Sequence, residues 1–584
     1  MKKSFRSLLA LLLCLTLVCG CLPGIADDSE EKVTLLQPVW ENGTGAPESA
    51  SLPFLIAETE WEGTLDVYFF NGDNDLPFMR LEDIPGLAEQ LVAAYGITGY
   101  TLTFEDLDTV YAFVRDNGSF LLMEFGENNE VMFSDFDLFY ALPGAVNGLD
   151  VIETNAAEGE DLYLIGHYER SYRSGKTIAI YLDDYQIPVP EYEGAHYLPL
   201  QFVSDMILAT TVCSLYYNGE IVVAGSASDI KTKLADRYYT NKDRVKSNAL
   251  TQYTYNELCL ALDYCYGLKE EHNITDFDTF FTQTGLFTKF GSADPADTWQ
   301  GLLELTLAYL SDGHSGALLH PSDFDAMSDY SNPLYINLLE SLNAALRYSF
   351  ARGQAHPEGL PAYQEVGDTA YITFDSFSMK SRSEIDYYEV ELENSASDTI
   401  ILLMYANEQL HRENCPIKNV VIDLTNNGGG AADAAMCVIA WVLGTATFSL
   451  ENEISGSQGT NMYVFDANRD RQINVEEDSI AHLNRYCLIS PCSFSCGNLV
   501  PAAFKRSDSV TMIGRTSGGG ACVVHALSTA DGAGFCVSGQ WRVNSVTNGS
   551  YISVDEGVEP DVYITHIETM YDREKLTELI DSLL

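Results

Sequence analysis

Positively charged residues are scarce in this chain of 584 residues. Lysine and arginine together number 32 against 85 aspartates and glutamates, which gives a formal net charge of −53 at pH 7. Such a charge repels nucleic acid and anionic membrane surfaces, and it disfavours polyphosphate substrates that are reached without a metal. The acidic residues are spread along the chain, as expected for solvated surfaces. We therefore expect no nucleic-acid partner.

Long apolar runs are also lacking, except near the N-terminus. Residues 1–6 are basic and residues 8–18 are apolar, a pattern typical of a secretion signal. The signal ends in Leu-Val-Cys-Gly-Cys, which resembles the lipobox of bacterial lipoproteins. That resemblance implies a signal peptide over residues 1–21 and a lipid-modified Cys21 that tethers the chain to the outer face of the cell membrane. Secretion after an ordinary cleavage is the alternative.

The chain has 13 cysteines, but no pair with the spacing of a metal site has a histidine nearby. Three of them belong to the signal, and several others lie inside apolar runs, as Cys437 and Cys487 do. Buried free thiols are therefore expected. A disulfide between Cys492 and Cys496 stays open.

The length predicts several domains, and changes in hydrophobic period suggest their limits. Residues 22–60 are rich in Asp, Glu, Gly, Pro and Ser, and we expect a flexible spacer there. Short alternating strands over residues 61–230 predict an α+β module. Helical spacing predicts a helical subdomain over residues 234–330, and alternating strands and helices predict an α/β core over residues 365–584.

Two segments of the predicted α+β module look related. Leu76–Leu91 and His196–Leu208 each place Leu-Pro beside a short amphipathic helix. This pattern resembles the N-terminal-like domain of copper amine oxidases, which implies a binding or spacing role without catalytic residues.

A glycine loop between a strand and a helix is the first site-like feature of the core. Val420–Ile422 predict a buried strand, Asn426–Gly430 form a polar loop, and an Ala-rich run follows. Consecutive glycines leave backbone N–H groups free to hold an oxyanion. A phosphate site is the other interpretation, but no Gly-Lys-Ser/Thr follows the loop. We predict half of an oxyanion hole.

A serine turn is the second such feature. Tyr486–Ile489 predict a short strand that runs into a Ser/Pro/Gly turn, and Leu499–Phe504 can form a helix. A serine at such a turn is exposed near the positive end of the helix. It can also be no more than an N-cap.

Four motifs in order carry a family resemblance: IDLTNNGGG, FSCGN, VTMIGRTSGGG and GVEPDVYI. Together they resemble the core of the C-terminal-processing (tail-specific) serine peptidases, and within these the tricorn-core and retinoid-binding-protein-like branch. The resemblance implies a multidomain α/β and α+β fold, with a core of crotonase-like ββα units beside the helical subdomain and the N-terminal module. It implies Ser495 as nucleophile, with Ser493 as the nearest competitor. Asn498 departs from the acid that the family places three residues after the serine.

The family resemblance also bears on the catalytic base. Tail-specific proteases use a lysine beyond the serine, but Gly514–Gly520 contains none. The tricorn-like branch uses an upstream histidine, and LSDGHSG resembles its signature, which implies His314. His525 and His320 are the rivals.

These assignments imply a serine-type endopeptidase that hydrolyses peptide bonds of a peptide or protein substrate. Ser495 would attack the carbonyl, and His314 would take its proton and later give it to the leaving amine. Backbone N–H groups of the oxyanion hole would come from the glycine loop and from the residue after the serine, namely Gly429, Gly430 and Cys496. Ser315 and either Asp555 or Glu556 are candidates to support the histidine. No cofactor is expected for catalysis.

Residues 465–477 resemble the Ca²⁺ loop of EF-hand and dockerin type. The expected ligands are Asp466, Asn468, Asp470, Gln472, Asn474 and Glu477. Arg471 stands where such loops have glycine, so an acidic surface turn is the alternative. Calcium, if bound, would have a structural role.

Two other functions remain open at this point. One is a catalytically inactive lipoprotein that binds peptides or cell-wall fragments on the same fold, and the other is a carrier of apolar ligands. Too few residues separate His314 from Tyr371 for a PDZ domain, so we expect none. The oligomeric state cannot be read from the sequence.

Overall fold

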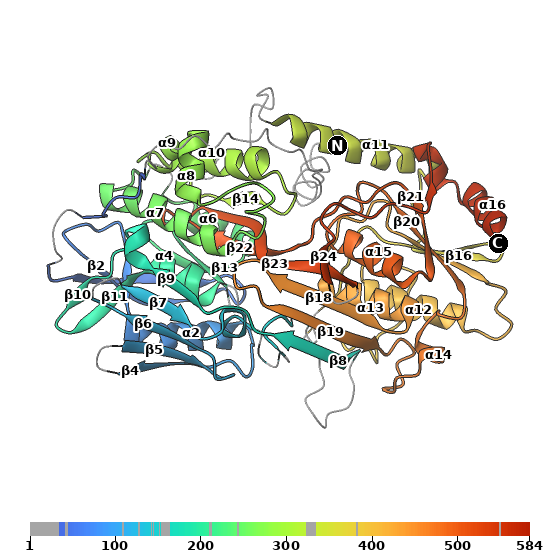
Figure 1. Ribbon diagram of the computed structural model, residues 1–584, viewed down its shortest axis with the longest axis horizontal. Coiled ribbons are helices and arrows are strands. Elements are labelled where there is room, and N and C mark those ends of the chain that lie inside the picture. The colour runs from blue at the N-terminus through green and yellow to red at the C-terminus, as the bar shows by residue number, and fades with distance from the viewer. Residues whose placement is uncertain are drawn as a thin grey trace.

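The structure is a computed structural model. It describes residues 34–584 except 41–44, 108–109, 127–128, 142, 144, 146, 151, 153–163, 210–212, 242–243, 323–334, 381–383 and 548–549. The elements gather into two lobes that lie side by side (Figure 1). The predicted signal and Cys21 lie outside the described residues.

The first lobe contains two antiparallel-rich sheets. The seven-stranded sheet has the order β10-β11-β3-β2-β1-β13-β12, and the five-stranded sheet has the order β4-β5-β6-β7-β9. The strands of the first sheet are β1 (Glu48–Ile56), β2 (Trp61–Phe69), β3 (Phe78–Arg80), β10 (Glu191–Tyr192), β11 (Ala195–Pro199), β12 (Ser214–Tyr217) and β13 (Val222–Gly225). Those of the second are β4 (Leu102–Asp106), β5 (Val110–Arg115), β6 (Phe120–Glu124), β7 (Glu130–Phe133) and β9 (Ile178–Tyr181).

The expected spacer over residues 22–60 is wrong for its second half. Strand β1 pairs with β2 along its whole length and with β13 at its end. Phe54 and Ile56 are buried there. The polar residues before residue 48 suggested a spacer, but the strand that follows them ends in apolar residues.

The two related segments lie next to each other. Strand β11 pairs antiparallel with β3, which places Pro199 opposite Phe78. Each strand leads into a helical segment, η1 (Leu81–Asp83) and α2 (Ile84–Ala94) after β3, and α4 (Leu200–Val203) and π-helix η3 (Ser204–Leu208) after β11. This arrangement is consistent with an internal repeat.

The helical region belongs to the same lobe. Its helices are α5 (Ala227–Lys233), α6 (Ala235–Tyr238), α7 (Asn248–Cys265), α8 (Phe277–Thr284), α9 (Phe287–Phe290), α10 (Pro295–Glu304) and π-helix η4 (Leu305–Leu310). Apolar residues of this region and of the N-terminal sheets form one continuous core. The two were expected as separate units, so this differs from the expectation. None of the described helices is both long enough and apolar enough to span a membrane.

The second lobe is built on a six-stranded sheet of order β15-β16-β17-β20-β21-β25. All its neighbours pair in parallel except β15 with β16. The strands are β15 (Tyr363–Val366), β16 (Thr369–Thr373), β17 (Asn419–Asp423), β20 (Asn484–Ile489), β21 (Val510–Gly514) and β25 (Val562–Tyr563). The helices around it are α11 (Ile336–Ala355), α12 (Thr399–Leu410), α13 (Ala432–Leu443), α15 (Cys496–Ser507), η6 (Ile567–Tyr571) and α16 (Arg573–Leu583).

Helices cover both faces of this sheet. Val420 and Ile422 of β17 pack with residues of α12, α13 and α15. Val421, between them, packs with α11 and α16 on the other face. Burial on both faces explains why the strand is a continuous apolar run, as parallel strands usually are. The predicted α/β core is therefore present.

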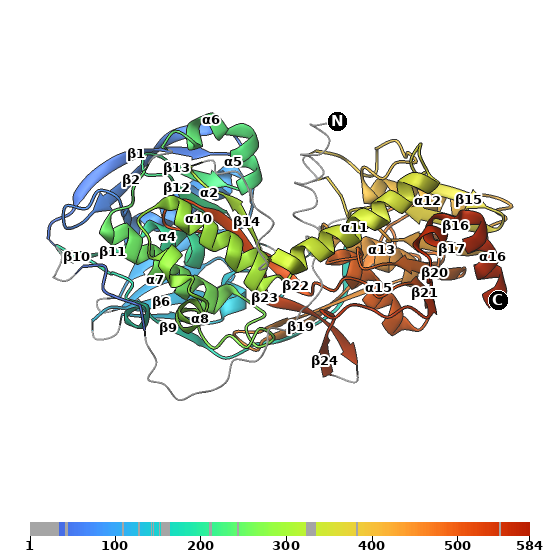
Figure 2. The ribbon, with the colours of Figure 1, turned by 90° about the horizontal axis from the view of Figure 1, so that it is seen from above.

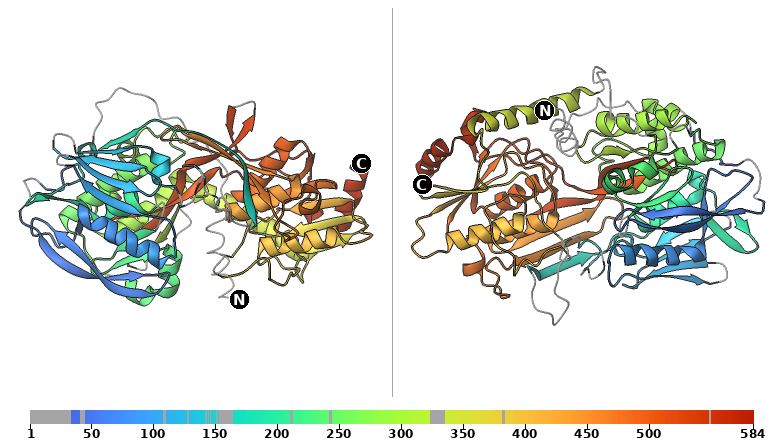
Figure 3. Two further views of the ribbon diagram at one scale, coloured as in Figure 1. Left: turned by 90° about the horizontal axis from the view of Figure 1, so that it is seen from below. Right: turned by 180° about the vertical axis from the view of Figure 1, so that it is seen from behind.

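A fourth sheet joins sequence regions that were expected to be separate. Its order is β14-β23-β18-β19-β8, with β22 and β24 also paired to β23. The strands are β8 (Ile165–Arg173), β14 (Gly316–Leu319), β18 (Ala446–Asn452), β19 (Gln458–Phe465), β22 (Cys522–Ser528), β23 (Gly534–Thr547) and β24 (Ser550–Ser553). Strand β8 leaves the first lobe to pair with β19 of the second, as Figure 3 shows. The range 61–230 is therefore not a self-contained module.

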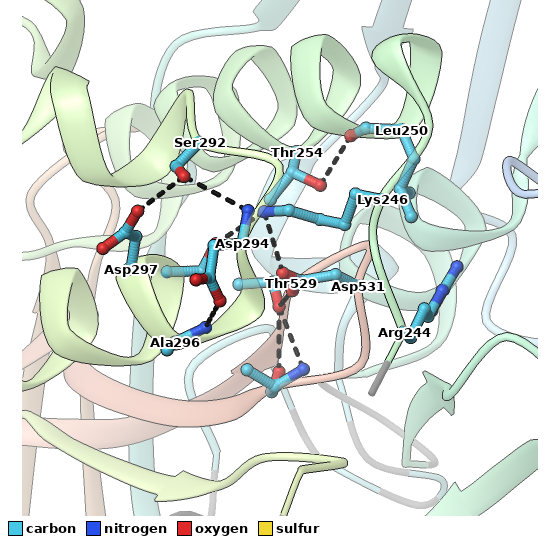
Figure 4. A network of polar contacts seen from close by, with 12 residues as sticks. Arg244, Lys246, Leu250, Thr254, Ser292, Asp294, Ala296, Asp297, Thr529 and Asp531 are labelled. Carbon is cyan, nitrogen blue, oxygen red and sulfur yellow. Dashed lines mark hydrogen bonds and ion pairs between the residues drawn. The ribbon is translucent and has the colours of Figure 1, made fainter. Parts of the chain in front are cut away.

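A buried ion pair fastens the helical region to the turn between β22 and β23 (Figure 4). The Lys246 Nζ lies 3.1 Å from an Asp531 carboxylate oxygen and donates to the Thr298 hydroxyl at 2.6 Å. Both charged side chains are at most 1% exposed. Burial would raise the pKa of Asp531, but the charges of Lys246 and His320 and the hydrogen bonds from Thr529 and Lys246 together outweigh it and hold that pKa below its ordinary value.

Removing one charge of this pair should destabilise the first lobe. We expect Lys246→Met to lower the free energy of unfolding by about 3–5 kcal/mol, because the buried Asp531 carboxylate loses its counter-charge. Urea unfolding followed by tryptophan fluorescence measures this. The double variant Lys246→Met/Asp531→Leu should recover most of the loss. The contribution of the native ion pair to the free energy of unfolding should also decrease as the pH falls below about 4, where the Asp531 carboxyl of the unfolded chain takes up a proton. A single variant as stable as the parent would contradict the assignment.

Candidate active site

Ser495 sits in a strained turn between β20 and α15. Its backbone has φ 55° and ψ −123°, a region that residues with a side chain rarely adopt. Its side chain makes no capping hydrogen bond to α15. The N-cap interpretation therefore fails, and the geometry is that of a serine presented on a sharp strand-to-helix turn.

The second glycine loop, residues 518–520, holds this turn in place. The Ser495 N–H donates to the Gly519 carbonyl at 2.9 Å, and the Gly518 N–H donates to the Ser493 carbonyl at 2.8 Å. These bonds form a short parallel bridge between Phe494 and Gly519. The VTMIGRTSGGG motif thus fixes the backbone of the serine turn.

The competing serine is structural. Ser493 is fully buried, its hydroxyl donates to the Leu424 carbonyl at 2.6 Å, and it accepts from the Ser490 N–H at 2.9 Å. Ser495, by contrast, is partly exposed, and its hydroxyl makes no hydrogen bond within the described part of the chain.

The first glycine loop passes directly over the Ser495 side chain. Gly429 has φ +107°, and a Cβ there would lie 2.7 Å from the Ser495 Cβ and 3.1 Å from its Oγ. No other residue fits this approach. The Gly429 N–H is engaged, because it donates to the Asn427 side chain at 2.9 Å.

Two other N–H groups beside the serine are unengaged. Neither the Gly430 N–H nor the Cys496 N–H has an acceptor among the described residues. Sequence reasoning named Gly429 first for the oxyanion hole, but the Asn427 side chain occupies its N–H, so the N–H groups of Gly430 and Cys496 stay as the candidate donors. A glycine run alone cannot reveal which of its N–H groups a nearby side chain occupies.

His314 lies in a tight turn that follows η4. The Asp312 carboxylate accepts from the N–H groups of His314 at 3.1 Å and Ser315 at 2.7 Å. It also accepts from the hydroxyls of Ser315 at 2.8 Å and Tyr266 at 3.0 Å. Asp312 therefore shapes the turn that carries the histidine. Sequence reasoning missed this role, although an Asp two residues before the histidine is a usual sign of a side-chain-capped turn.

The His314 ring packs against Phe494, the residue before Ser495. Their ring centroids are 4.9 Å apart. The Phe494 ring also fills the space beside two glycines, because a Cβ on Gly313 or Gly520 would lie 2.5–2.6 Å from its atoms. Phe494 thus brings the histidine turn and the serine turn together.

The His314 imidazole is buried and unpaired. Among the residues that the structure describes, neither ring nitrogen has a hydrogen-bond partner. Burial lowers the pKa of His314, and the negative charges of Asp312 and Asp555 oppose this only in part. The ring is therefore neutral near pH 7 and has a nitrogen free to accept a proton. It does not bond Ser495 here, and such bonds often tighten only with substrate.

The two candidate acids are now distinguished. Asp555 acts on His314 through its charge, and its carboxylate accepts from the Ala521 N–H at 2.8 Å. Glu556 is exposed. Of the two candidates, Asp555 is the one whose negative charge raises the pKa of His314.

Asn498, the departure from the family pattern, holds the segment that carries Asp555. Its side-chain amide donates to the Val554 carbonyl at 2.8 Å and accepts from the Ser517 hydroxyl at 2.6 Å. The same Ser517 oxygen accepts from the Val558 N–H. A neutral amide performs this bridging because it both donates and accepts.

The rival histidines are engaged elsewhere. His525 bonds the Gln540 side chain at 2.9 Å. His320 stacks on Trp299 and lies in the field of the Asp531 ion pair.

The predicted calcium loop is a turn organised around the Asp466 carboxylate. Asp466 accepts from the N–H groups of residues 469–471, and Arg471 adopts φ 64°, the conformation that glycine usually supplies. The other expected ligands make turn-type contacts, in which side chains of Asn468, Asp470 and Asn474 accept from the N–H groups of residues 470, 472 and 476, and Glu477 accepts from Asn468. Across the described residues, no three His, Cys, Asp or Glu side chains gather as a metal site. Calcium binding stays a prediction.

Comparison with known proteins identifies the second lobe. The model of peptidase family S41 matches residues 368–564, which include the serine turn, both glycine loops and Asp555. No curated protein matches the chain closely enough to count as a relative.

Solved structures resemble parts of the chain. A lipoprotein from Streptococcus agalactiae shares 15% identity over 52% of this chain and 88% of its own, with a TM-score of 0.33. The photosystem II D1 C-terminal processing protease shares 17% identity over 34% of this chain and 42% of its own, with a TM-score of 0.24. The tricorn protease shares 13% identity over 43% of this chain and 19% of its own, with a TM-score of 0.23.

The family model agrees with the resemblance that the four motifs indicated. Residues 368–564 are therefore similar to the domain of peptidase family S41, a family of serine peptidases.

Proposed function

We propose that the chain is an endopeptidase in which Ser495 is the nucleophile and His314 the general base. The observation that carries this proposal is the backbone of Ser495, whose φ of 55° and ψ of −123° have no structural use that we can identify. Strain of this kind costs about 1–3 kcal/mol and persists where it presents a reactive group.

The neighbouring groups support a complete reaction. Neutral His314 takes the proton of the Ser495 hydroxyl as the oxygen attacks a peptide carbonyl, and a tetrahedral intermediate forms. The N–H groups of Gly430 and Cys496 stabilise its oxyanion, each by about 3 kcal/mol. The intermediate collapses to an acyl-enzyme when protonated His314 gives its proton to the leaving amine. Water, activated by the same histidine, then releases the acid.

Asp555 contributes through charge. The imidazolium that forms during attack lies in the field of Asp555 and Asp312, whose negative charges favour the protonated ring. Both acids thus stabilise the state that precedes amine release.

The nucleophile assignment predicts a labelling pattern. A fluorophosphonate probe should label the wild-type chain at Ser495, and Ser495→Ala should abolish the label because no oxygen remains to displace fluoride. Intact-mass spectrometry measures it. Ser493→Ala, two residues away on a buried serine, is the matched control and should still react if it folds. An unlabelled wild type would instead favour the inactive, peptide-binding alternative.

The base assignment predicts the pH dependence of that labelling. Burial lowers the pKa of His314 below its ordinary 6.5, so the labelling rate should stay high below pH 6.5 and fall only on further acidification. Asp555→Asn removes a charge that raises this pKa, so the acid limb should move to lower pH. Glu556→Gln, the exposed neighbour, should leave the limb unchanged. The same acid limb of the pH–rate profile in the wild type, Asp555→Asn and Glu556→Gln would rule out Asp555 as the supporting acid.

The cell location and the metal are further proposals. We propose a lipid tether through Cys21 that places the peptidase outside the membrane, as the lipobox pattern implies. We also propose that Ca²⁺ binds the loop that begins at Asp466, which would stabilise the insertion between the oxyanion strand and the nucleophile strand.

Calcium addition provides the test for that loop. At a free concentration of 100 times Kd, Ca²⁺ should stabilise the chelator-treated protein by about 2.7 kcal/mol, seen as a rise in the melting temperature of the core. Asp466→Asn should remove the rise, and Asp581→Asn, an acid outside the loop, should keep it. A melting temperature indifferent to Ca²⁺ would mean an acidic surface turn.

A further inference from the structure

The C-terminal segment of the chain contacts the first glycine loop. This segment comprises η6 and α16, and it follows residues 368–564, the S41-like domain. Two of its polar side chains are buried, since Tyr571 is fully covered and Arg573 is only 5% exposed. Buried polar groups need hydrogen-bond partners, so the partners of these two residues show what the segment holds in place.

Arg573 is paired with the acid that ends strand β17. Its Nη2 donates to the Asp423 carboxylate at 2.6 Å and to the Thr373 hydroxyl at 2.9 Å. The other carboxylate oxygen of Asp423 accepts from the Thr425 N–H at 3.0 Å and from the Thr425 hydroxyl at 2.7 Å. The guanidinium also lies over the Tyr371 ring, 4.5 Å from its centroid. Arg573 therefore fixes the carboxylate from which the glycine loop begins.

Tyr571 bonds the same loop three residues further along. Its hydroxyl donates to the side-chain oxygen of Asn426 at 2.5 Å. Its own backbone carbonyl accepts from the Nε2 of His356, just beyond the end of α11, at 2.6 Å. A carbonyl oxygen can only accept, so the histidine nitrogen is the donor of this bond. Tyr571 is thus held by the segment after α11, and it holds the glycine loop in turn.

The residue after Asn426 connects this hold to both turns of the site. The Asn427 side chain accepts from the Gly429 N–H at 2.9 Å and donates to the Phe374 carbonyl at 3.0 Å. The Asn427 carbonyl accepts from the Phe494 N–H at 3.1 Å. A displacement of Asn426 would therefore move the bonds that shape the glycine loop, and with them the bond that joins the loop to the serine turn.

The sequence of the loop makes such a hold necessary. Residues 428–430 are glycines, which have no side chain to pack, and Gly429 and Gly430 have φ of +107° and +133°. Glycine loses more conformational freedom on folding than any other residue, so bonds from neighbouring segments have to restrict the loop. A buried ion pair adds little stability over apolar packing, but its hydrogen bonds are directional. The contacts of Arg573 and Tyr571 therefore suit the positioning of the loop.

We propose that Tyr571 and Arg573 are positioning residues of the peptidase site, which hold residues 423–430 in the form that directs a loop N–H at the oxyanion. Neither residue touches the substrate, and both act through the loop. The proposal rests on the proposed function, in which Ser495 is the nucleophile. It adds to the working site a segment that lies outside the S41-like domain.

The kinetics of fluorophosphonate labelling of the full chain test this role. The phosphonyl oxygen of the probe takes the place of the oxyanion, so the position of the loop affects the maximal labelling rate, kinact. The probe concentration for half-maximal rate, KI, reports binding instead. We expect Tyr571→Phe to lower kinact about fivefold with KI unchanged, because one hydrogen bond to the loop is lost.

The partner of that bond gives an independent test. Asn426→Leu removes the acceptor and should also lower kinact about fivefold. The double variant Tyr571→Phe/Asn426→Leu should be no slower than the slower single variant, because both changes break the same bond. Arg573→Lys keeps the positive charge beside Asp423 and should have a higher kinact than Arg573→Met.

Tyr563→Phe is the matched control, because this tyrosine of β25 is 62% exposed, and it should have the kinact of the wild type. Melting temperatures show which variants are folded at the assay temperature. Asn426→Leu changes a side chain that is only partly buried, so it covers the case in which Tyr571→Phe fails to fold.

The outcomes separate this proposal from the proposed function. A wild type without a label on Ser495 would overturn both. If the wild type is labelled there, three results would each overturn the positioning role alone. They are an unchanged kinact in the folded Tyr571→Phe and Asn426→Leu variants, a change in KI alone, and additive effects of the two changes in the double variant.

Discussion

The packing of one aromatic ring holds together the two turns that carry the proposed catalytic groups. Phe494 immediately precedes Ser495, the proposed nucleophile, touches the ring of His314, and fills space that a Cβ on Gly313 or Gly520 would need. Its contacts come from three segments that are far apart in sequence. Because cores pack at near-crystalline density, a shift of this ring would displace the histidine turn relative to the serine turn. Gly313 and Gly520 are therefore required because a side chain at either position would occupy the space of the Phe494 ring, apart from any need for backbone flexibility.

The shared sheet gives this contact a rigid frame. Strand β14 begins two residues after His314 and pairs with β23, so the histidine turn is continuous with a sheet that also contains strands of the second lobe. A Cys536 thiol adds a contact to the His314 carbonyl. Helix α11 spans the two lobes on their outer side (Figure 2). The helical region is consequently attached to the core by strand pairing as well as by the chain itself.

Local patterns allowed the strand, glycine loop and helix around Asn427 to be predicted, because burial on both faces of a parallel sheet leaves a continuous apolar run. The serine turn and the histidine turn were also placed, the first by a strand followed by turn residues and both by family motifs. What could not be predicted depends on contacts between distant residues. The partner of β8 lies nearly three hundred residues away, the Asn427 side chain decides which glycine N–H stays free, and the orientation of Asp555 follows from Asn498 and Ser517. A one-residue ambiguity in sequence, such as Asp555 against Glu556, is resolved only when a strand end fixes which side chain faces inward.

The unpaired state of His314 has an energetic meaning. A buried imidazole without a hydrogen bond lowers stability by about 1–3 kcal/mol, and so does the strained serine backbone. In the proposed reaction, the cost at His314 is relieved when the ring takes up a proton, since protonated His314 is stabilised by Asp312 and Asp555. This unfavourable feature of the free site would thus become favourable in the transition state, which is the condition for catalysis as opposed to tight binding of the substrate. An apolar packing partner such as Phe494, which offers the ring no hydrogen bond, preserves that difference.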